Sequence, residues 1–369
     1  MEFDVCSDLP FASNAAATMH IITLDLGTGS LKACLWNEYS LLRRLSAPIA
    51  TRHDGPRAEQ DPAQWWNATR DTLRELDASH ADAICITGHM HCVVPTDEKG
   101  RALSYAVVVP DRRARQECDD IAREFDIDAM LQRTGGRLDP TSVAAKARHF
   151  SQTDEAGWRN ARWLLSPKDW LRMQLTGEAL TDPTDAAGSL WWDITSQSWW
   201  NEFAQFCGAR EASLPPVRAT ASICGTVSEF AARETGLHAG MAVVVGGGDD
   251  IESFGAGVTT RGDFYEHLGT TGSLFVTLDA PHFDPNARLE CVPDAMPHRW
   301  LLGGSTSAAG ASLRWIGRAT GDQSWPRDDW SSVGDVPGEI VFLPYLGGER
   351  CPLWDPARAG AFLLSLIHI

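Results

Sequence analysis

The segment DLGTGSLK, at residues 25–32, decides which fold this chain is predicted to adopt. It joins the β-branched run 20–26 to a second apolar run at 31–36, and together they predict an antiparallel hairpin. Its two glycines permit a tight turn that exposes backbone N–H groups, with the hydroxyls of Thr28 and Ser30 as further donors. Such a turn can hold a phosphate group, although an ordinary hairpin with an aspartate at its end also fits these residues.

A carboxylate and a second turn extend this phosphate hypothesis. Asp25 ends the first strand, and a carboxylate beside a bound phosphate repels it unless a cation such as Mg²⁺ lies between them. The segment LGTTGS, at residues 268–273, repeats the chemistry within a second predicted hairpin at 262–278. This weak internal repeat suggests two related halves, whose turns could hold the two ends of a polyphosphate.

Another carboxylate follows the predicted strand 242–245 and the glycines at 246–248. Ligands of open α/β sheets bind at the carboxyl ends of strands, and small residues let a substrate approach the backbone. Asp249 could therefore accept the proton of a hydroxyl group that attacks phosphorus. The same residue also fits the N-cap of a helix, with Glu252 completing a capping box.

Two polar segments follow other predicted strands. His89 and His91 come after the strand 83–87, where hydrogen bonds to a polar ligand are favoured over a metal site because no third ligand is near. A loop histidine that the protein itself satisfies is the structural alternative. Asp111 and Arg113 follow another apolar run and could position hydroxyl groups or stabilise charge, or simply form a solvated turn.

The remaining periodicity predicts helices and strands of an α/β protein. The helix predicted at 61–78 has Asp61 as its N-cap, and Gln64 fits a capping box. A second helix is predicted to begin after Ser166 and to end at Gly177. The other predicted elements are strands at 107–109, 162–165 and 340–343 and a helix at 306–320.

Composition excludes several classes of protein. The chain has 369 residues, 43% of them hydrophobic, so it can form two packed domains or one large one and is not intrinsically disordered. Its net charge of −17 argues against binding nucleic acid, which needs clustered Lys and Arg. No apolar stretch approaches the roughly 20 residues that cross a bilayer. Its 9 cysteines form no C-x-x-C pair, which indicates a reduced, cytoplasmic protein.

Tryptophan is unusually frequent, with 15 residues beside 4 tyrosines. Trp65, Trp66, Trp170, Trp191 and Trp192 lie in or beside predicted elements, so we expect them in the core rather than on a platform for sugar stacking. The tryptophan content by itself therefore gives little support to carbohydrate binding.

Taken in order along the chain, these motifs resemble those of the FGGY family of carbohydrate kinases, over about residues 19–362. The two phosphate motifs of the family resemble 25–32 and 268–272, and its catalytic aspartate motif resembles 247–249. Further segments similar to the family are GHMH at 88–91, the region 106–113, LSPKDWL at 165–171, TDPTDAAG at 181–188 and FLPYLGGERCP at 342–352.

This resemblance implies an α/β fold of the actin-like ATPase (ribonuclease H-like) type, with two related domains around a central cleft. We expect a disordered or non-native lead at 1–18, a sugar-binding domain at 19–245 and a nucleotide-binding domain at 246–369 that is incomplete. ATP and Mg²⁺ are the cofactors that the resemblance implies, with Asp25 and Asp249 near the metal.

The resemblance also implies roles for individual residues. Asp249 is expected to be the catalytic base. The expected sugar contacts are Met90, His91, Asp111, Arg113, Asp249 and Asp250. The residues expected against the phosphates of ATP are Gly27, Thr28, Gly29, Ser30, Lys32, Gly269, Thr270, Thr271, Gly272 and Gly310.

The reaction implied is ATP-dependent phosphorylation of a ketose such as D-xylulose, with another ketose or a polyol as the alternative. Three departures from the family pattern lie where the sugar would bind: His89 replaces a glutamine, Val109 replaces a tryptophan and Asp250 replaces an asparagine. Residues 364–369 match the family poorly, so a truncated or misread terminus is expected.

Two other functions stay open from the sequence. A chain without the family's last segments could be an inactive fragment that binds sugar. An actin-like ATPase or assembly protein would share the paired phosphate turns, although His91, Asp111 and the segment 342–352 favour a sugar kinase. The expected partners are a sugar and ATP, with no nucleic acid or membrane, and a homodimer is left open.

Overall fold

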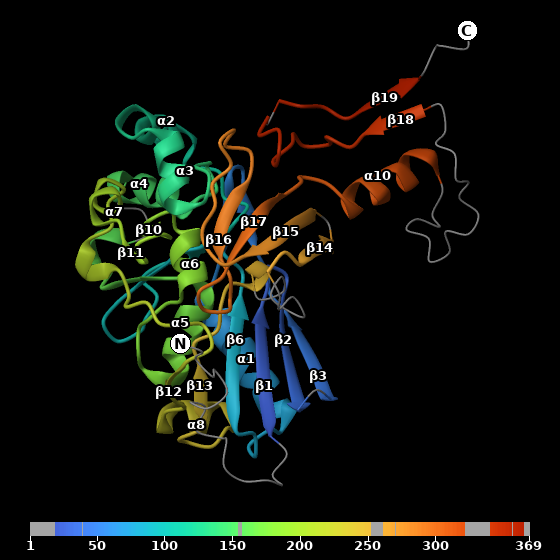
Figure 1. The fold of residues 1–369 in the computed structure, drawn as a ribbon. Coiled ribbons are helices and arrows are strands. Elements are labelled where there is room, and N and C mark those ends of the chain that lie inside the picture. The colour runs from blue at the N-terminus through green and yellow to red at the C-terminus, as the bar shows by residue number, and fades with distance from the viewer. Residues whose placement is uncertain are drawn as a thin grey trace.

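The computed structural model describes residues 19–38, 40–153, 157–251, 261–269, 271–321, 340–355 and 357–364. They form two domains, coloured blue to yellow and orange to red in Figure 1. The strands of the first domain are β1 (His20–Leu26), β2 (Ser30–Asn37), β3 (Ser40–Pro48), β4 (Arg52–Asp54), β5 (Arg57–Gln60), β6 (Ala83–Gly88), β7 (Val94–Thr96), β8 (Ala106–Val107), β9 (Trp163–Leu165), β10 (Trp192–Asp193), β11 (Ser198–Trp199), β12 (Ile223–Thr226) and β13 (Ala242–Val244). Its helices are α1 (Pro62–Leu76), α2 (Arg115–Glu124), α3 (Ile127–Thr134), α4 (Val143–Thr153), α5 (Pro167–Thr176), α6 (Pro183–Gly188), α7 (Asn201–Phe206) and α8 (Glu229–Thr235). The second domain contains β14 (Phe264–Leu268), β15 (Gly272–Leu278), β16 (Glu290–Pro293), β17 (Trp300–Ser305), α10 (Gly310–Thr320), β18 (Ile340–Leu343) and β19 (Ala361–Leu364).

A six-stranded mixed sheet, in the order β12-β13-β6-β1-β2-β3, forms the centre of the first domain. Its strands β1 and β2 form the predicted antiparallel hairpin, in which Asp25 lies opposite Lys32. β1 also runs parallel to β6, and β6 runs parallel to β13, so the carboxyl ends of these three strands meet at one edge. In Figure 1 this edge points towards the second domain.

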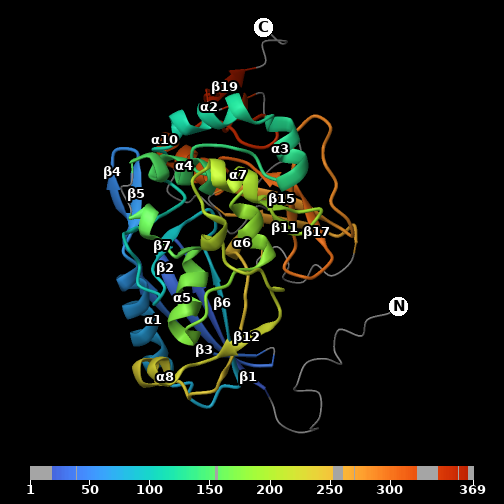
Figure 2. The same ribbon diagram turned by 90° about the vertical axis from the view of Figure 1, so that its left-hand side faces the viewer.

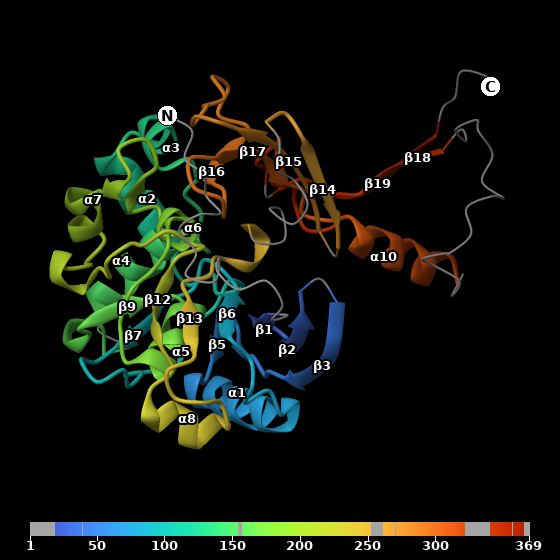
Figure 3. The same cartoon turned by 60° about the horizontal axis from the view of Figure 1, so that its bottom comes forward.

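The core of the first domain lies between this sheet and its helices. Ile22, Leu24 and Leu26 of β1 are fully buried, because alternate residues of a strand point to the same face. Figure 3 shows α1, α5 and α8 along one face of the sheet, and their apolar residues share a single cluster with the strands. Four of the five tryptophans expected in the core are buried, and the fifth, Trp66, packs against it.

Two predicted helices are confirmed by their caps. The Asp61 carboxylate accepts a hydrogen bond from the first turn of α1, and the hydroxyl of Ser166 does the same for α5, which ends at the left-handed Gly177. The predicted capping box of α1 is wrong, because the side-chain oxygen of Gln64 instead accepts the backbone N–H of Ala50 at 3.2 Å. That contact ties α1 to the end of β3.

Two predicted boundaries differ from the structure for local reasons. The strand expected at 107–109 ends at Val107, because the N–H of Asp111 bonds to the carbonyl of Val108 and turns the chain. The helix expected at 306–320 begins only at Gly310. Thr306 belongs to the strand pairing instead, since its N–H donates to the carbonyl of Gly272 at 2.7 Å.

The second domain contains a four-stranded antiparallel sheet in the order β14-β15-β17-β16. Its strands β14 and β15 form the second predicted hairpin. The helices α3 and α6 of the first domain contact β16, and Figure 2 shows them beside the orange strands. Apolar side chains cross this boundary, because Ile194 of the first domain shares a buried cluster with Cys291 and Trp300 of the second. The backbone N–H of Cys291 also donates to the carbonyl of Gly135 at 2.8 Å.

The helices that the structure describes are all too short or too polar to cross a membrane.

Candidate functional site

A cavity of about 130 Å³ lies between the two domains, with residues of both in its wall. Three carboxylates, two guanidinium groups and His91 give it a polar lining suited to a ligand with many hydroxyl groups. Trp354 and Phe275 add apolar surface. The charged residues in its wall are Arg137, Asp139, Asp250, Glu290 and Arg350. Among the expected sugar contacts, Met90, His91 and Asp250 line this cavity.

His91 has a strained backbone, with φ of 56° in the left-handed region that favours glycine. The buried ammonium group of Lys146 holds this conformation, because it donates to the carbonyl oxygens of His91 at 3.0 Å and of Val108 at 2.9 Å. The imidazole Nδ1 also lies 3.1 Å from the carbonyl of Gly188. Burial lowers the pKa of Lys146. Both the backbone and the ring of His91 are therefore fixed in the wall of the cavity.

Asp111 and Arg113 are not in the lining of the cavity. The Asp111 carboxylate is fully buried and accepts hydrogen bonds from the backbone of Ala58 and from Arg113. The guanidinium group of Arg113 also pairs with Glu59 at 2.7 Å and lies over the ring of Phe150. The structure thus places these two expected sugar contacts in a network of protein partners that supports the wall.

The first glycine turn is held from behind by a residue that sequence reasoning missed. Gln60 is buried, and its amide nitrogen donates to the carbonyl of Thr28 at 2.7 Å. Its amide oxygen accepts the indole N–H of Trp65, which fixes the orientation of the amide. Inside the turn, the N–H of Gly27 donates to the carbonyl of Ser30. Gly29 is exposed at the tip of this turn.

The second glycine turn lies against the start of α10. The N–H of Gly310 donates to the carbonyl of Gly269 at 2.9 Å, and a Cβ on Gly310 would come within 2.5 Å of that oxygen. Gly269, Thr271 and Gly272 of the expected phosphate set lie in this turn, and Gly269 contacts Gly310; that they bind a phosphate stays a prediction. Thr270, which belongs to the same expected set, lies outside the described residues.

Two glycines allow the backbone before Asp249 to pass close to its neighbours, where a side chain would not fit. Gly246 has φ of 73°, and a Cβ there would lie only 1.8 Å from the carbonyl oxygen of Ile86. Gly248 bridges to Gly88 in parallel, and a Cβ on Gly248 would lie 2.3 Å from the sulfur of Met90. Larger residues cannot occupy either position without moving a neighbouring strand or the wall of the cavity.

Asp249 is the first residue of a helical turn, and its carboxylate accepts the N–H of Asp250 at 2.9 Å, so the structure does not place it at the N-cap position of the alternative. Its partner in that alternative, Glu252, lies outside the described residues. Burial, together with the charges of Asp250 and Asp25, raises the pKa of Asp249 to about 8. The three carboxylates are thus close enough to repel one another.

Asp25 has two oxygens in different surroundings. Its Oδ2 accepts a hydrogen bond from the Lys32 ammonium group at 2.7 Å, whereas its buried Oδ1 has no partner among the described residues. An orphaned carboxylate oxygen beside other carboxylates is a donor set that fits a hard divalent cation. The residues present are therefore compatible with Mg²⁺ at Asp25 and Asp249.

His89 has a structural role in the first domain. It is buried, and its Nδ1 lies 2.7 Å from the carbonyl of Leu26, so this nitrogen must carry the proton. Its ring packs edge-on against Trp65. Burial lowers the pKa of His89 to about 4. The alternative of a loop histidine satisfied by the protein fits this placement better than a metal site does.

A fully buried cluster of charges lies behind α6. The ammonium group of Lys168 contacts Asp169 at 2.5 Å, Asp182 at 2.8 Å and Asp185 at 3.1 Å, and Arg172 adds a contact to Asp169 at 2.9 Å. These three carboxylates could together ligate a metal ion, but Lys168 already supplies a cation at their centre. Burial raises the pKa of Asp185 to about 6.

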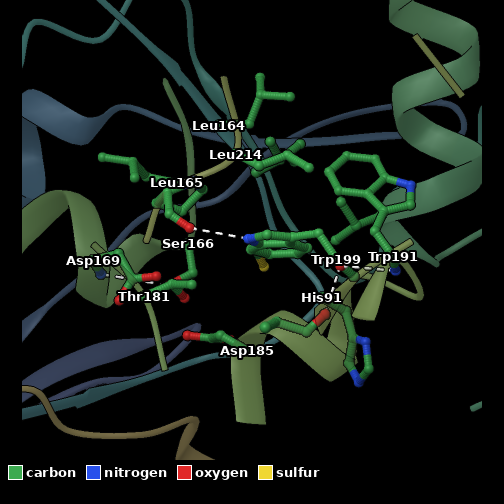
Figure 4. Close-up of a pocket in the computed structure, with 16 residues that line it drawn as sticks. His91, Leu164, Leu165, Ser166, Asp169, Thr181, Asp185, Trp191, Trp199 and Leu214 are labelled. Atoms are coloured by element: carbon green, nitrogen blue, oxygen red, sulfur yellow. Dashed lines mark hydrogen bonds between the residues drawn. The ribbon is translucent and has the colours of Figure 1, made fainter. Parts of the chain in front are cut away.

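A cavity of about 30 Å³ borders this cluster in the first domain. Figure 4 shows polar side chains on one side of it and indole rings on the other. The polar residues are Ser166, Asp169, Thr181 and Asp185, and the indoles are Trp191 and Trp199.

Comparison with known proteins identifies the protein family to which the chain belongs. Residues 20–255 match the N-terminal domain of the FGGY family of carbohydrate kinases, and residues 265–366 match its C-terminal domain. The chain therefore belongs to the FGGY family of carbohydrate kinases. It is accordingly a sugar kinase, a phosphotransferase that uses ATP, and its fold is that of the actin-like ATPases.

The similar proteins include kinases of more than one sugar. The chain is 30% identical to the xylulose kinase of Escherichia coli K12 over 356 residues, which are 94% of this chain and 73% of that protein. It is 26% identical to the gluconokinase of Bacillus subtilis, and the match covers 95% of this chain and 72% of that protein. Among solved structures, the xylulose kinase of Rhodospirillum rubrum matches with a TM-score of 0.84 and 28% identity, covering 95% of this chain and 74% of that one.

Proposed function

We propose that this sugar kinase phosphorylates a ketose, D-xylulose being the first to test, with Asp249 as the catalytic base. The observation that carries the proposal is the place of Asp249, which follows β13 and its glycines and directly precedes Asp250 in the wall of the interdomain cavity. Asp249 itself is not in that lining, and the charge of Asp25 is among the causes that raise its pKa. A raised pKa increases the proton affinity of the Asp249 carboxylate, which acts as a base in its ionised form; a divalent cation bound beside it would favour that form.

The chemistry proposed is a direct transfer of the γ-phosphoryl group. The sugar hydroxyl oxygen attacks the γ-phosphorus of ATP, and its proton passes to the Asp249 carboxylate. The bond from the γ-phosphorus to the bridging oxygen breaks, and ADP leaves with those electrons. We propose that the two glycine turns, around Thr28 and at 269–272, orient the phosphates; the N–H groups of Gly269 and Gly310 already donate within the second turn and shape it.

Asp25 and Asp249 are the residues that we propose hold Mg²⁺. When bound, the ion supplies positive charge that offsets the phosphate oxygens during transfer. The unpartnered Oδ1 of Asp25 supports this assignment, because a buried carboxylate oxygen without a donor is costly. Lys32 occupies the other oxygen of Asp25 and keeps that carboxylate oriented.

The charges around the cavity favour a neutral sugar over a sugar acid. Asp139, Asp250 and Glu290 outnumber Arg137 and Arg350 in its wall. An acid such as gluconate carries a negative charge that these three carboxylates repel. D-xylulose is neutral, and its hydroxyl groups can pair with both carboxylates and guanidinium groups. Another neutral ketose or a polyol is the alternative that the same lining supports.

We also propose that the enzyme acts in the cytoplasm. All eight cysteines that the structure describes have free thiols, which suits a reducing compartment where ATP is abundant.

The proposal is tested by sugar-dependent ADP release with a panel of D-xylulose, other ketoses, polyols and gluconate. Asp249→Asn should lower turnover by at least 10²-fold, because the amide cannot accept the hydroxyl proton. Asp54→Asn, at an exposed aspartate of β4, serves as the matched control and should keep full activity. Wild-type turnover in folded Asp249→Asn would refute the base assignment. A gluconate preference would refute the substrate class.

A further inference from the structure

Three side chains from three different elements hold the backbone that leads into Asp249. Arg172 of α5 donates to the carbonyl of Val245 at 2.6 Å, and Thr87 of β6 donates to the carbonyl of Gly247 at 2.9 Å. The hydroxyl oxygen of Thr184, on α6, accepts the N–H of Gly248 at 2.8 Å. The last contact is the nearest to Asp249 and joins residues 64 positions apart.

The hydroxyl of Thr184 has its orientation fixed by a carboxylate. It donates to Oδ2 of Asp182 at 2.6 Å, which uses its single proton. A lone pair of the hydroxyl oxygen is then left for the N–H of Gly248. Thr184 is 1% exposed, so water does not compete for this contact.

Asp182 is in turn held by the buried charge cluster. Its Oδ1 lies 2.8 Å from the ammonium group of Lys168, which also contacts Asp169 and Asp185. Removing one member would leave a buried charge without its partner, which folded proteins tolerate poorly. The cluster therefore fixes Asp182, and through it the hydroxyl that reaches Gly248.

The geometry points to Thr184 as a positioning residue for Asp249, and to Asp182 and Lys168 as the pair that orients it. This inference rests on the proposed role of Asp249 as base. Gly248 is the residue directly before Asp249 and has no side chain of its own to fix it. A displacement of about 1 Å in a reacting group can cost about 10²-fold in rate. The hydrogen bond from the Gly248 amide to Thr184 can therefore affect catalysis although Thr184 does not contact the sugar.

The test compares Thr184→Val with Thr184→Ser. Valine has nearly the shape of threonine but no acceptor, whereas serine retains the hydroxyl. We expect Thr184→Val to lower kcat about 10- to 100-fold while KM for D-xylulose changes less than threefold. Thr184→Ser should restore kcat to within threefold of the wild-type value. All assays are run well below the melting temperature of each variant.

A matched control separates this role from simple loss of stability. Thr235 of α8 is also buried, and its hydroxyl donates within its own helix to the carbonyl of Ala231. Thr235→Val removes a buried hydroxyl of α8, which lies at the end of the first domain away from the second domain in Figure 1, and should leave kcat unchanged. The binding constant for D-xylulose, measured by calorimetry, should stay within threefold of the wild-type value in Thr184→Val.

Several results would overturn the inference. Wild-type kcat in folded Thr184→Val would do so, and so would equal loss of kcat in Thr184→Ser. If Thr184→Val does not fold, Thr184→Ala is measured by the same criteria, and failure of both to fold assigns Thr184 to the fold alone. Asp249→Asn is measured in parallel. Full activity of Asp249→Asn would contradict the proposed base. An inactive Asp249→Asn together with a fully active Thr184→Val would contradict only the positioning role of Thr184.

Discussion

The single proton on His89 makes the stability of the fold depend on pH. Because burial lowers its pKa to about 4, the folded protein keeps this ring neutral where an unfolded chain, with a pKa near 6.5, binds a proton. The unfolded state then binds more protons between these two values. Stability is therefore full above about pH 7, falls as the pH drops through 6.5, and loses no more from this residue below about pH 4.

His89→Gln should remove this dependence, because a glutamine amide can also donate to the carbonyl of Leu26 and does not titrate. Between pH 7 and pH 5, the variant should lose about 2 kcal/mol less unfolding free energy than the wild type. Urea denaturation at both pH values measures this difference. His53→Gln, at an exposed histidine of β4, should behave as the wild type. Equal losses in His89→Gln and the wild type would contradict the assignment.

At the residue scale, the sequence predicted the residues that follow strands and missed the residues that support them. Asp25 and Asp249 could be found because a carboxylate at the end of an apolar run is visible locally. Thr184 and Gln60 could not be found, since each acts on a backbone group more than 30 residues away. Glu290 was missed for a similar reason, since it reaches the cavity wall only when the second domain packs against the first.

At the scale of elements, α1 shows how a single cap contributes. Asp61 accepts a hydrogen bond from the first turn, whereas Gln64 is used to hold Ala50. Asp61→Ala should therefore lower the free energy of unfolding by about 1 kcal/mol, and Asp61→Asn should change it by only a few tenths. Urea denaturation at pH 7 checks both values. If Asp61→Ala costs nothing, the cap does not contribute to stability.

The elements themselves were largely predictable because their signals are local. Both hairpins, α1 and α5 follow from glycine turns, apolar alternation and capping residues. The start of α10 did not follow, because Thr306 has a strand neighbour that only the folded sheet provides. The order of the six strands in the first sheet also depends on long-range pairing, which no local pattern encodes.

At the scale of the whole molecule, the interdomain cavity belongs to both domains. Met90 and His91 come from the first domain, and Glu290 and Arg350 come from the second. A ligand that binds only this folded arrangement stabilises it by mass action. D-xylulose at 100 times its dissociation constant should raise the free energy of unfolding by about 2.7 kcal/mol.

Thermal unfolding with and without D-xylulose measures this effect. Asp249→Asn should keep the shift in melting temperature while losing turnover, which separates binding from catalysis. A shift without ADP release in the wild-type chain would instead favour a fragment that only binds sugar. No shift with any ketose or polyol would contradict the proposal that sugar binds in the interdomain cavity. Sugar-independent ATP hydrolysis would favour an ATPase.

The left-handed backbone of His91 has a consequence for engineering. A residue with a side chain costs roughly 1 kcal/mol in this conformation, and glycine would relieve that strain. A library selected for heat resistance alone would therefore tend to replace His91. The stabilised variants would lose an imidazole from the wall of the interdomain cavity, where we propose that the sugar binds. Selection for stability and selection for turnover would then favour different residues at this position.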